Sequence, residues 1–185
     1  GIFAYVGTEQ GIANWISEFL SRYHGFDPQT TGADTVSYYW GLLTVGCVLG
    51  LILLKLFDSK LVLRVFTIAA MISLAAALFS GGNVPLYFFP AAGFFLSVMW
   101  SIVFSLALNS VYKHHGSFSG ILCTGIIGGA IVPLVIGFIS DFTGLRFGML
   151  FLFLTLGYIL SISIWANPII KNETFFNKAA AKAVS

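Results

Sequence analysis

Six long apolar stretches, separated by short polar segments, constrain the fold of this chain more than any other feature. They cover residues 1–21, 36–57, 61–80, 85–112, 117–140 and 145–166. A helix crosses the hydrocarbon core of a bilayer with about 20 apolar residues, so each stretch is long enough to span a membrane. The connections carry turn residues such as Asp27-Pro28 and Gly81-Gly82, and connections this short make neighbouring helices antiparallel. We predict an all-α integral membrane protein with a six-helix bundle over residues 1–166 and a short cytoplasmic tail over 167–185.

The composition excludes several classes of protein. Only 9% of the residues are charged, against about 25% in soluble domains, while 58% are hydrophobic. The net charge is +2 and the basic residues are scattered, which argues against a nucleic-acid partner. Cys47 and Cys123 lie in apolar runs without metal-ligand spacing, and residues 116–120 do not match a nucleophile-elbow motif. We therefore expect no enzyme activity, no metal and no cofactor.

The distribution of basic residues predicts the orientation. Seven of the nine fall on the side that holds both ends of the segment: Lys55, Lys60, Arg64, Lys113, Lys171, Lys178 and Lys182. Basic loops face the cytoplasm, so both ends are predicted to be cytoplasmic and the protein to be a multi-pass protein of the cell (inner) membrane. Because Gly1 opens directly on an apolar run, we interpret the chain as a fragment cut within or just before a transmembrane helix.

The first stretch carries polar residues where the membrane would surround them. Glu9 is the only carboxylate well inside a predicted span, and a charge facing lipid is costly, so it should face a cavity or a partner. Gln10 and Asn14 share another helical face with Ser17, beside Trp15. Amides at such positions either contribute to a binding site or join helices by hydrogen bonding.

The fourth stretch carries a ladder of polar residues, Ser97, Ser101, Ser105 and Asn109, each four positions from the next. On a helix this spacing places them along one narrow stripe, beside Trp100 and Phe104. Hydroxyls and an amide beside flat aromatic rings suit a sugar, although serines also pack helices together.

The fifth stretch combines Gly128 and Gly129 with Pro133. Proline removes a backbone donor and glycines soften the same turns, which predicts a kinked helix that acts as a hinge or holds a static bend.

Three of these segments resemble the major facilitator superfamily, and within it the fucose permease branch of sugar–proton symporters. They are Tyr5-Val6-Gly7 with Glu9, residues 97–107, and residues 128–133 with Gly137 and Asp141. The resemblance implies that the chain is the carboxy-terminal half of a twelve-helix fold, with the amino-terminal six helices missing, and that the first and fourth spans line the central cavity. Ser101-Ile102 departs from the proline and threonine usual in this family. Glu9 is closer to the glucose/galactose relatives than to fucose permeases.

The resemblance implies a secondary transporter that imports a hexose-type sugar by symport with H⁺ or Na⁺ through alternating access. The residues predicted to contact the sugar are Glu9, Gln10, Asn14, Trp15, Trp100, Ser101, Ser105 and Asn109. Gly128, Gly129 and Pro133 are the predicted hinge. Membrane lipid and the missing half are the other expected partners. Two alternatives stay open: an exporter of another small molecule from the same superfamily, and a membrane scaffold or sensor that does not transport.

Overall fold

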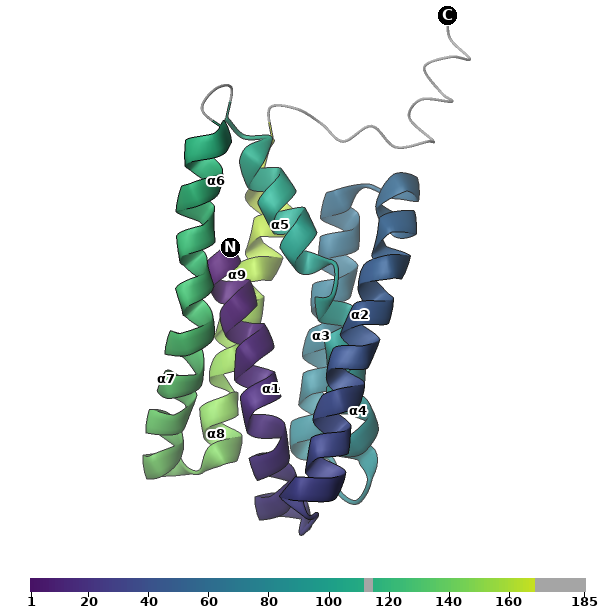
Figure 1. The fold of residues 1–185 in the computed structure, drawn as a ribbon, viewed down its shortest axis with the longest axis vertical. Helices are drawn as coiled ribbons and strands as arrows, with labels where there is room; N and C mark the ends of the chain where they lie inside the picture. The colour runs from purple at the N-terminus through teal and green to yellow at the C-terminus, as the bar shows by residue number, and fades with distance from the viewer. Residues whose placement is uncertain (112–114, 169–185) are drawn as a thin grey trace, which may run out of the picture.

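The structure, a computed structural model, describes residues 1–111 and 115–168 (Figure 1). Every secondary-structure element among these residues is a helix. The predicted tail beyond Pro168 and the basic residues Lys113, Lys171, Lys178 and Lys182 lie outside the described residues. The elements are α1 (Ile2–His24), η1 (Pro28–Gly32), α2 (Ala33–Leu56), α3 (Ser59–Phe79), α4 (Val84–Leu96), α5 (Met99–Leu108), α6 (His115–Thr124), η2 (Gly125–Ile127), α7 (Gly128–Thr143), α8 (Leu145–Met149) and α9 (Phe151–Trp165).

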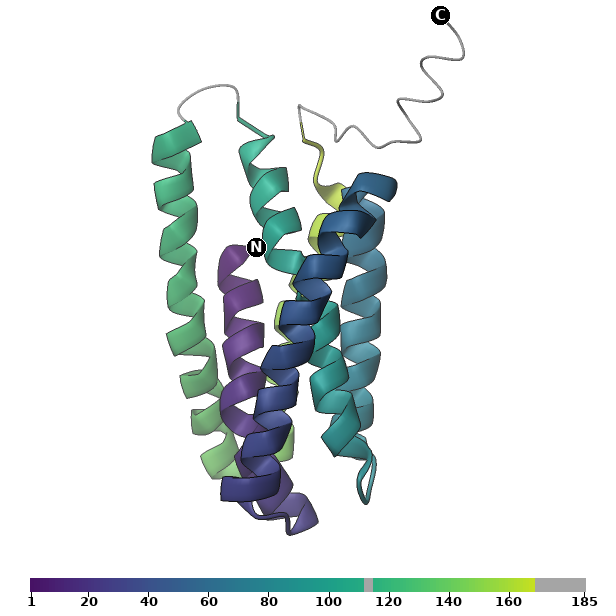
Figure 2. The same cartoon turned by 45° about the vertical axis from the view of Figure 1, so that its right-hand side comes forward.

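These elements stack end to end into six antiparallel rods (Figures 1 and 2). Four rods are composite: η1 with α2, α4 with α5, α6 with η2 and α7, and α8 with α9. The other two rods are α1 and α3. The tight turns at one end use glycines in the left-handed region, Gly25 at φ 69° and Gly82 at φ 63°. At the other end the Asp58 carboxylate caps α3 by accepting hydrogen bonds from the backbone N–H groups of Lys60 (2.9 Å) and Leu61 (3.2 Å).

Five helical segments of the described chain are long and apolar enough to cross a membrane: Pro28–Leu56, Ser59–Phe79, Val84–Leu108, Gly116–Thr143 and Leu145–Trp165. The predicted first span is not among them, because α1 carries several polar residues, including Glu9, Gln10 and Asn14. Half of the α1 residues are nevertheless buried, since this helix contacts α7, α9 and α2. A helix surrounded by other helices can hold polar side chains that a lipid-facing helix cannot.

The stretch predicted as one span over residues 85–112 is divided at Ser97-Val98, where α4 ends and α5 begins. The backbone N–H of Ser97 bonds to the carbonyl of Phe94 three residues back, and the Ser97 hydroxyl donates to the same oxygen at 2.7 Å. Gly46 of α2 lies so close that a Cβ there would collide with the Ser97 hydroxyl. The break therefore occurs at a close approach of two helices and without a proline at the break itself.

Close backbone contact joins α1 to α7. A Cβ at Gly128 would collide with the Phe3 carbonyl oxygen, and a Cβ at Gly7 would collide with Val132. Small residues allow this approach, which is typical of packed membrane helices. On another side of α1, the hydroxyls of Thr8 and Thr155 lie 2.7 Å apart, both buried, and tie α1 to α9.

Candidate functional site

Glu9 lies half-buried in the first half of α1, and two tyrosines donate hydrogen bonds to it. The Tyr5 hydroxyl donates to Glu9 Oε1 at 3.3 Å from one turn earlier on the same helix. The hydroxyl of Tyr39, a fully buried residue of α2, donates to the Glu9 backbone carbonyl at 3.1 Å. The two contacts fix the carboxylate and the helix segment that carries it.

A pocket of about 360 Å³ opens beside this carboxylate. It takes its lining from α1, α2, the α4–α5 segment and η2: Tyr5, Val6, Glu9, Leu43, Cys47, Ser97, Trp100, Ser101 and Ile126. A second pocket of about 210 Å³ shares Cys47, Ser97 and Ser101 with it and extends the space toward Leu54. A mostly apolar lining with a few placed polar groups is the usual composition of a small-molecule site.

Trp100, which lines the pocket, contacts two other aromatic rings. The Trp100 ring lies 6.0 Å from Tyr5 and 6.0 Å from Phe104, the latter nearly parallel at 14°. An indole held in this way offers a flat apolar surface, while the carboxylate of Glu9 and the hydroxyl of Ser101 supply an acceptor and a donor. This arrangement can bind a compact polar molecule with an apolar face.

The predicted sugar-contact residues separate into groups in the structure. Glu9, Trp100 and Ser101 line the pocket together. Ser105 and Asn109 lie further along or just beyond α5, half-buried, with Asn109 Nδ2 donating to Ser105 Oγ at 3.4 Å. They are not part of the lining.

Gln10 and Trp15 face α7 instead. The indole N–H of Trp15 donates to the Pro133 carbonyl at 3.2 Å, and a Cβ at Gly129 would lie 3.0 Å from Cγ of Gln10. Asn14 is exposed on α1. These residues stay predicted contacts and are not brought to the Glu9 pocket.

The predicted hinge lies where one rod changes helix type. The 3₁₀ turn η2 directly precedes Gly128, and Pro133 sits inside α7. Gly128 is buried against α1, so it serves close packing there. Pro133 accepts the Trp15 hydrogen bond at its carbonyl.

Two residues at or beside the pocket escape analysis of the sequence. Tyr39 and Cys47 both lie on α2, and nothing in the residue pattern indicates that they approach α1 or Ser97. Cys47 Sγ donates to the Ser97 carbonyl at 3.3 Å. Tyr5 has a signal, since it precedes Glu9 by four residues and therefore shares its face.

Comparison with known proteins finds relatives that are named as sugar transporters. The chain is 34% identical over 165 residues to the glucose/galactose transporter of Brucella abortus, covering 86% of this chain and 39% of that protein. It is 30% identical to the L-fucose-proton symporter of Escherichia coli, covering 77% of this chain and 32% of that protein. A crystal structure of the E. coli fucose–proton symporter superposes with a TM-score of 0.83 at 23% identity, over 90% of this chain and 41% of the other.

The chain has the fold of that structure, which belongs to the major facilitator superfamily. A second structure, of the superfamily transporter in its outward conformation, gives a TM-score of 0.79 at 24% identity. No family model matches the chain. The chain spans between about a third and two fifths of the length of the curated relatives it matches. The predicted fold, one helical half of a superfamily protein, is confirmed, as is the multi-pass membrane class. These relatives are transporters, which agrees with the prediction of a protein without enzyme activity.

Proposed function

We propose that this chain forms the carboxy-terminal half of a secondary transporter that imports a hexose-type sugar by cation symport. The observation that carries the proposal is the pocket in which Glu9, Trp100 and Ser101 meet. A carboxylate accepts hydrogen bonds from sugar hydroxyls, and an indole face packs on the C–H surface of a pyranose ring. The names of the relatives, glucose/galactose transporter and fucose–proton symporter, support a sugar as the substrate class and a proton as the coupling ion.

Glu9 has two possible roles in this mechanism. Its carboxylate accepts hydrogen bonds from the sugar, or it takes up the coupling proton as the site changes its access. The position of Glu9 in a pocket between several helices suits either role, because transporters of this kind bind substrate within the helix bundle, near the bilayer midplane between two halves.

The basic residues at one end of the bundle support the proposed orientation. Lys60 Nζ donates to the Ile164 carbonyl at 3.3 Å, and the Arg64 guanidinium donates to the Ser163 carbonyl at 3.3 Å. Both cations lie at the carboxyl end of α9, where they also complement the helix dipole. With Lys55 nearby on α2, this end is proposed to face the cytoplasm of a cell inner membrane.

Uptake into liposomes tests the proposal. The complete protein is reconstituted, and accumulation of labelled hexoses is followed with and without an imposed proton or sodium gradient. Gradient-dependent accumulation that one unlabelled sugar competes is the expected result. If folded protein accumulates no hexose under either gradient, the sugar assignment fails, and an exporter of another small molecule becomes the leading function.

A further inference from the structure

One buried face of α2 contacts both walls of the Glu9 pocket. Four of the 24 residues of α2 are buried: Thr35, Tyr39, Gly46 and Gly50. Their spacing of four or seven residues places them along one side of the helix. The other residues of α2 are half-buried or exposed, so the helix packs most tightly along this face.

Tyr39 links three helices from this face. Its ring is fully buried against Gly93 of α4, where an added Cβ would lie 2.8 Å from Cδ2 of Tyr39. Its hydroxyl donates to the Glu9 carbonyl of α1 at 3.1 Å. A hydroxyl buried this deeply costs free energy when it has no partner, so this bond ties the α1 backbone at Glu9 to α2.

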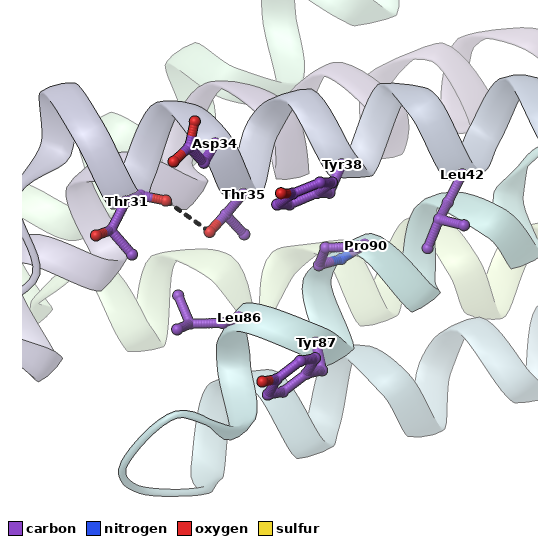
Figure 3. Close-up of a pocket in the computed structure, with 8 residues that line it drawn as sticks. All are labelled: Thr31, Asp34, Thr35, Tyr38, Leu42, Leu86, Tyr87 and Pro90. Carbon is purple, nitrogen blue, oxygen red and sulfur yellow. Dashed lines mark hydrogen bonds between the residues drawn. The ribbon is translucent and has the colours of Figure 1, made fainter.

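Two polar neighbours of Tyr39 on the same rod make other contacts. Thr35 donates to the Thr31 carbonyl at 2.7 Å, and Tyr38, 65% exposed, lines a separate pocket with Pro90 of α4 (Figure 3). Tyr38 is therefore a matched control for Tyr39, because it has the same side chain on the same helix but lies outside the lining of the Glu9 pocket.

The opposite wall of the pocket is held from the same side of α2. A Cβ at Gly46 would collide with the Ser97 hydroxyl, and Cys47 Sγ donates to the Ser97 carbonyl at 3.3 Å. Ser97 lies at the break that leads into α5, where Trp100 and Ser101 line the pocket. Gly46 is seven residues from Tyr39, a rise of about 10 Å along the helix, so α2 is braced against both walls at nearby points.

We infer that Tyr39 is a positioning residue of the proposed transport site: its hydroxyl holds α1 at the rotation in which the Glu9 carboxylate faces Trp100 and Ser101. Successive side chains of an α-helix differ by about 100° in direction, so a modest rotation of α1 turns Glu9 away from this wall. A bond to the backbone carbonyl of Glu9 itself restrains that rotation at the residue where it matters. Tyr39 acts on the sugar only through Glu9, so this role rests on the proposed function.

A double-mutant cycle on the complete protein tests the inference, with equilibrium binding of labelled glucose, galactose and fucose as the measurement. Tyr39→Phe keeps the buried ring and removes the hydroxyl, and it should weaken sugar binding by about fivefold. In a Glu9→Gln background the same substitution should change affinity by less than about twofold, because the charged group that it positions is gone. A role in packing alone predicts the same loss in both backgrounds.

Two controls separate positioning from stability. Tyr38→Phe should leave affinity unchanged. Thr67→Val removes a fully buried hydroxyl that donates to the Leu63 carbonyl at 2.7 Å on α3. It should lower the thermal midpoint about as much as Tyr39→Phe does, with no change in affinity.

The possible failures are distinguishable. If the parent protein binds none of the three hexoses, the proposed function fails and the role of Tyr39 falls with it. If the parent binds sugar and Tyr39→Phe binds it equally well, only the inference is overturned. The inference is also overturned if Tyr39→Phe causes the same loss with Glu9 or Gln at position 9, or if Glu9→Gln has no effect on affinity.

Discussion

The Tyr5 hydroxyl and the Glu9 carboxylate lie 3.3 Å apart on successive turns of α1, with Tyr5 donating to Oε1. This contact engages one carboxylate oxygen and orients the group toward the pocket that Trp100 and Ser101 line. Among the described residues, no hydrogen bond reaches Oε2, which leaves that oxygen for a ligand hydroxyl or a proton.

Glu9→Gln should weaken sugar binding by about 10- to 100-fold, the range for losing a hydrogen bond to a charged acceptor. Equilibrium binding of labelled sugar to the complete protein measures the effect. Glu18→Gln is the matched control, because that carboxylate pairs with Arg22 at the exposed end of α1 and should not alter affinity. Unchanged affinity together with unchanged gradient coupling would remove Glu9 from the site.

Tyr5→Phe keeps the ring against Trp100 but removes the donor to Glu9. We expect about fivefold weaker sugar binding, because one hydrogen bond contributes about 1 kcal/mol and the carboxylate loses its orientation. Tyr23→Phe serves as the control: its hydroxyl accepts from the Arg146 N–H at the far end of the bundle. An equal loss in both variants would indicate a general effect on folding.

Trp100→Leu should reduce sugar affinity by about 10-fold, since leucine fills part of the space but offers no flat ring surface. Trp165→Leu, at the exposed end of α9, is the comparison and should have no effect on affinity. Competition binding with a series of hexoses measures both. Identical affinities in the Trp100 variant and the parent would argue against an aromatic platform.

Gly128→Ala should destabilise the bundle by about 1–3 kcal/mol, because the added methyl collides with the Phe3 carbonyl. Gly157→Ala tests the same substitution in α9, where an added Cβ meets nothing within 4 Å, and should be neutral or slightly stabilising. Thermal unfolding in detergent compares the two. Equal midpoints would contradict the close packing of α1 and α7.

Pro133→Ala restores a backbone donor in the middle of α7 and should straighten and stiffen this helix. If Pro133 is part of a hinge, the maximal uptake rate falls while the sugar Kd stays the same. Pro90→Ala, inside α4, is the matched control for replacing a helical proline elsewhere. A change in Kd with an unaltered rate would assign Pro133 to binding rather than to motion.

Much of the fold was predictable because membrane spanning is a local property. Each apolar run is long enough to cross a bilayer by itself. The connections are local features too, because Asp58 caps the start of α3 and Gly82 adopts the left-handed conformation of a tight turn. The break at Ser97-Val98 was not predictable, since no proline marks it and the partner at the close approach, Gly46, is about fifty residues away in sequence. The position of α1 was also not predictable. Its polar residues make it less apolar than the other spans, and the fold tolerates them because neighbouring helices cover about half of α1.

The sequence by itself determined the class of protein, the number of rods and the unusual residues within them, Glu9 above all, because hydropathy and residue chemistry are readable one segment at a time. Only the tertiary structure decided which of those residues meet. Helix rotation and crossing bring Glu9, Trp100 and Ser101 into one pocket and turn Gln10 and Trp15 toward α7. Those angles result from contacts between distant segments, such as Gly128 against Phe3 and Tyr39 against Glu9, which no local pattern encodes.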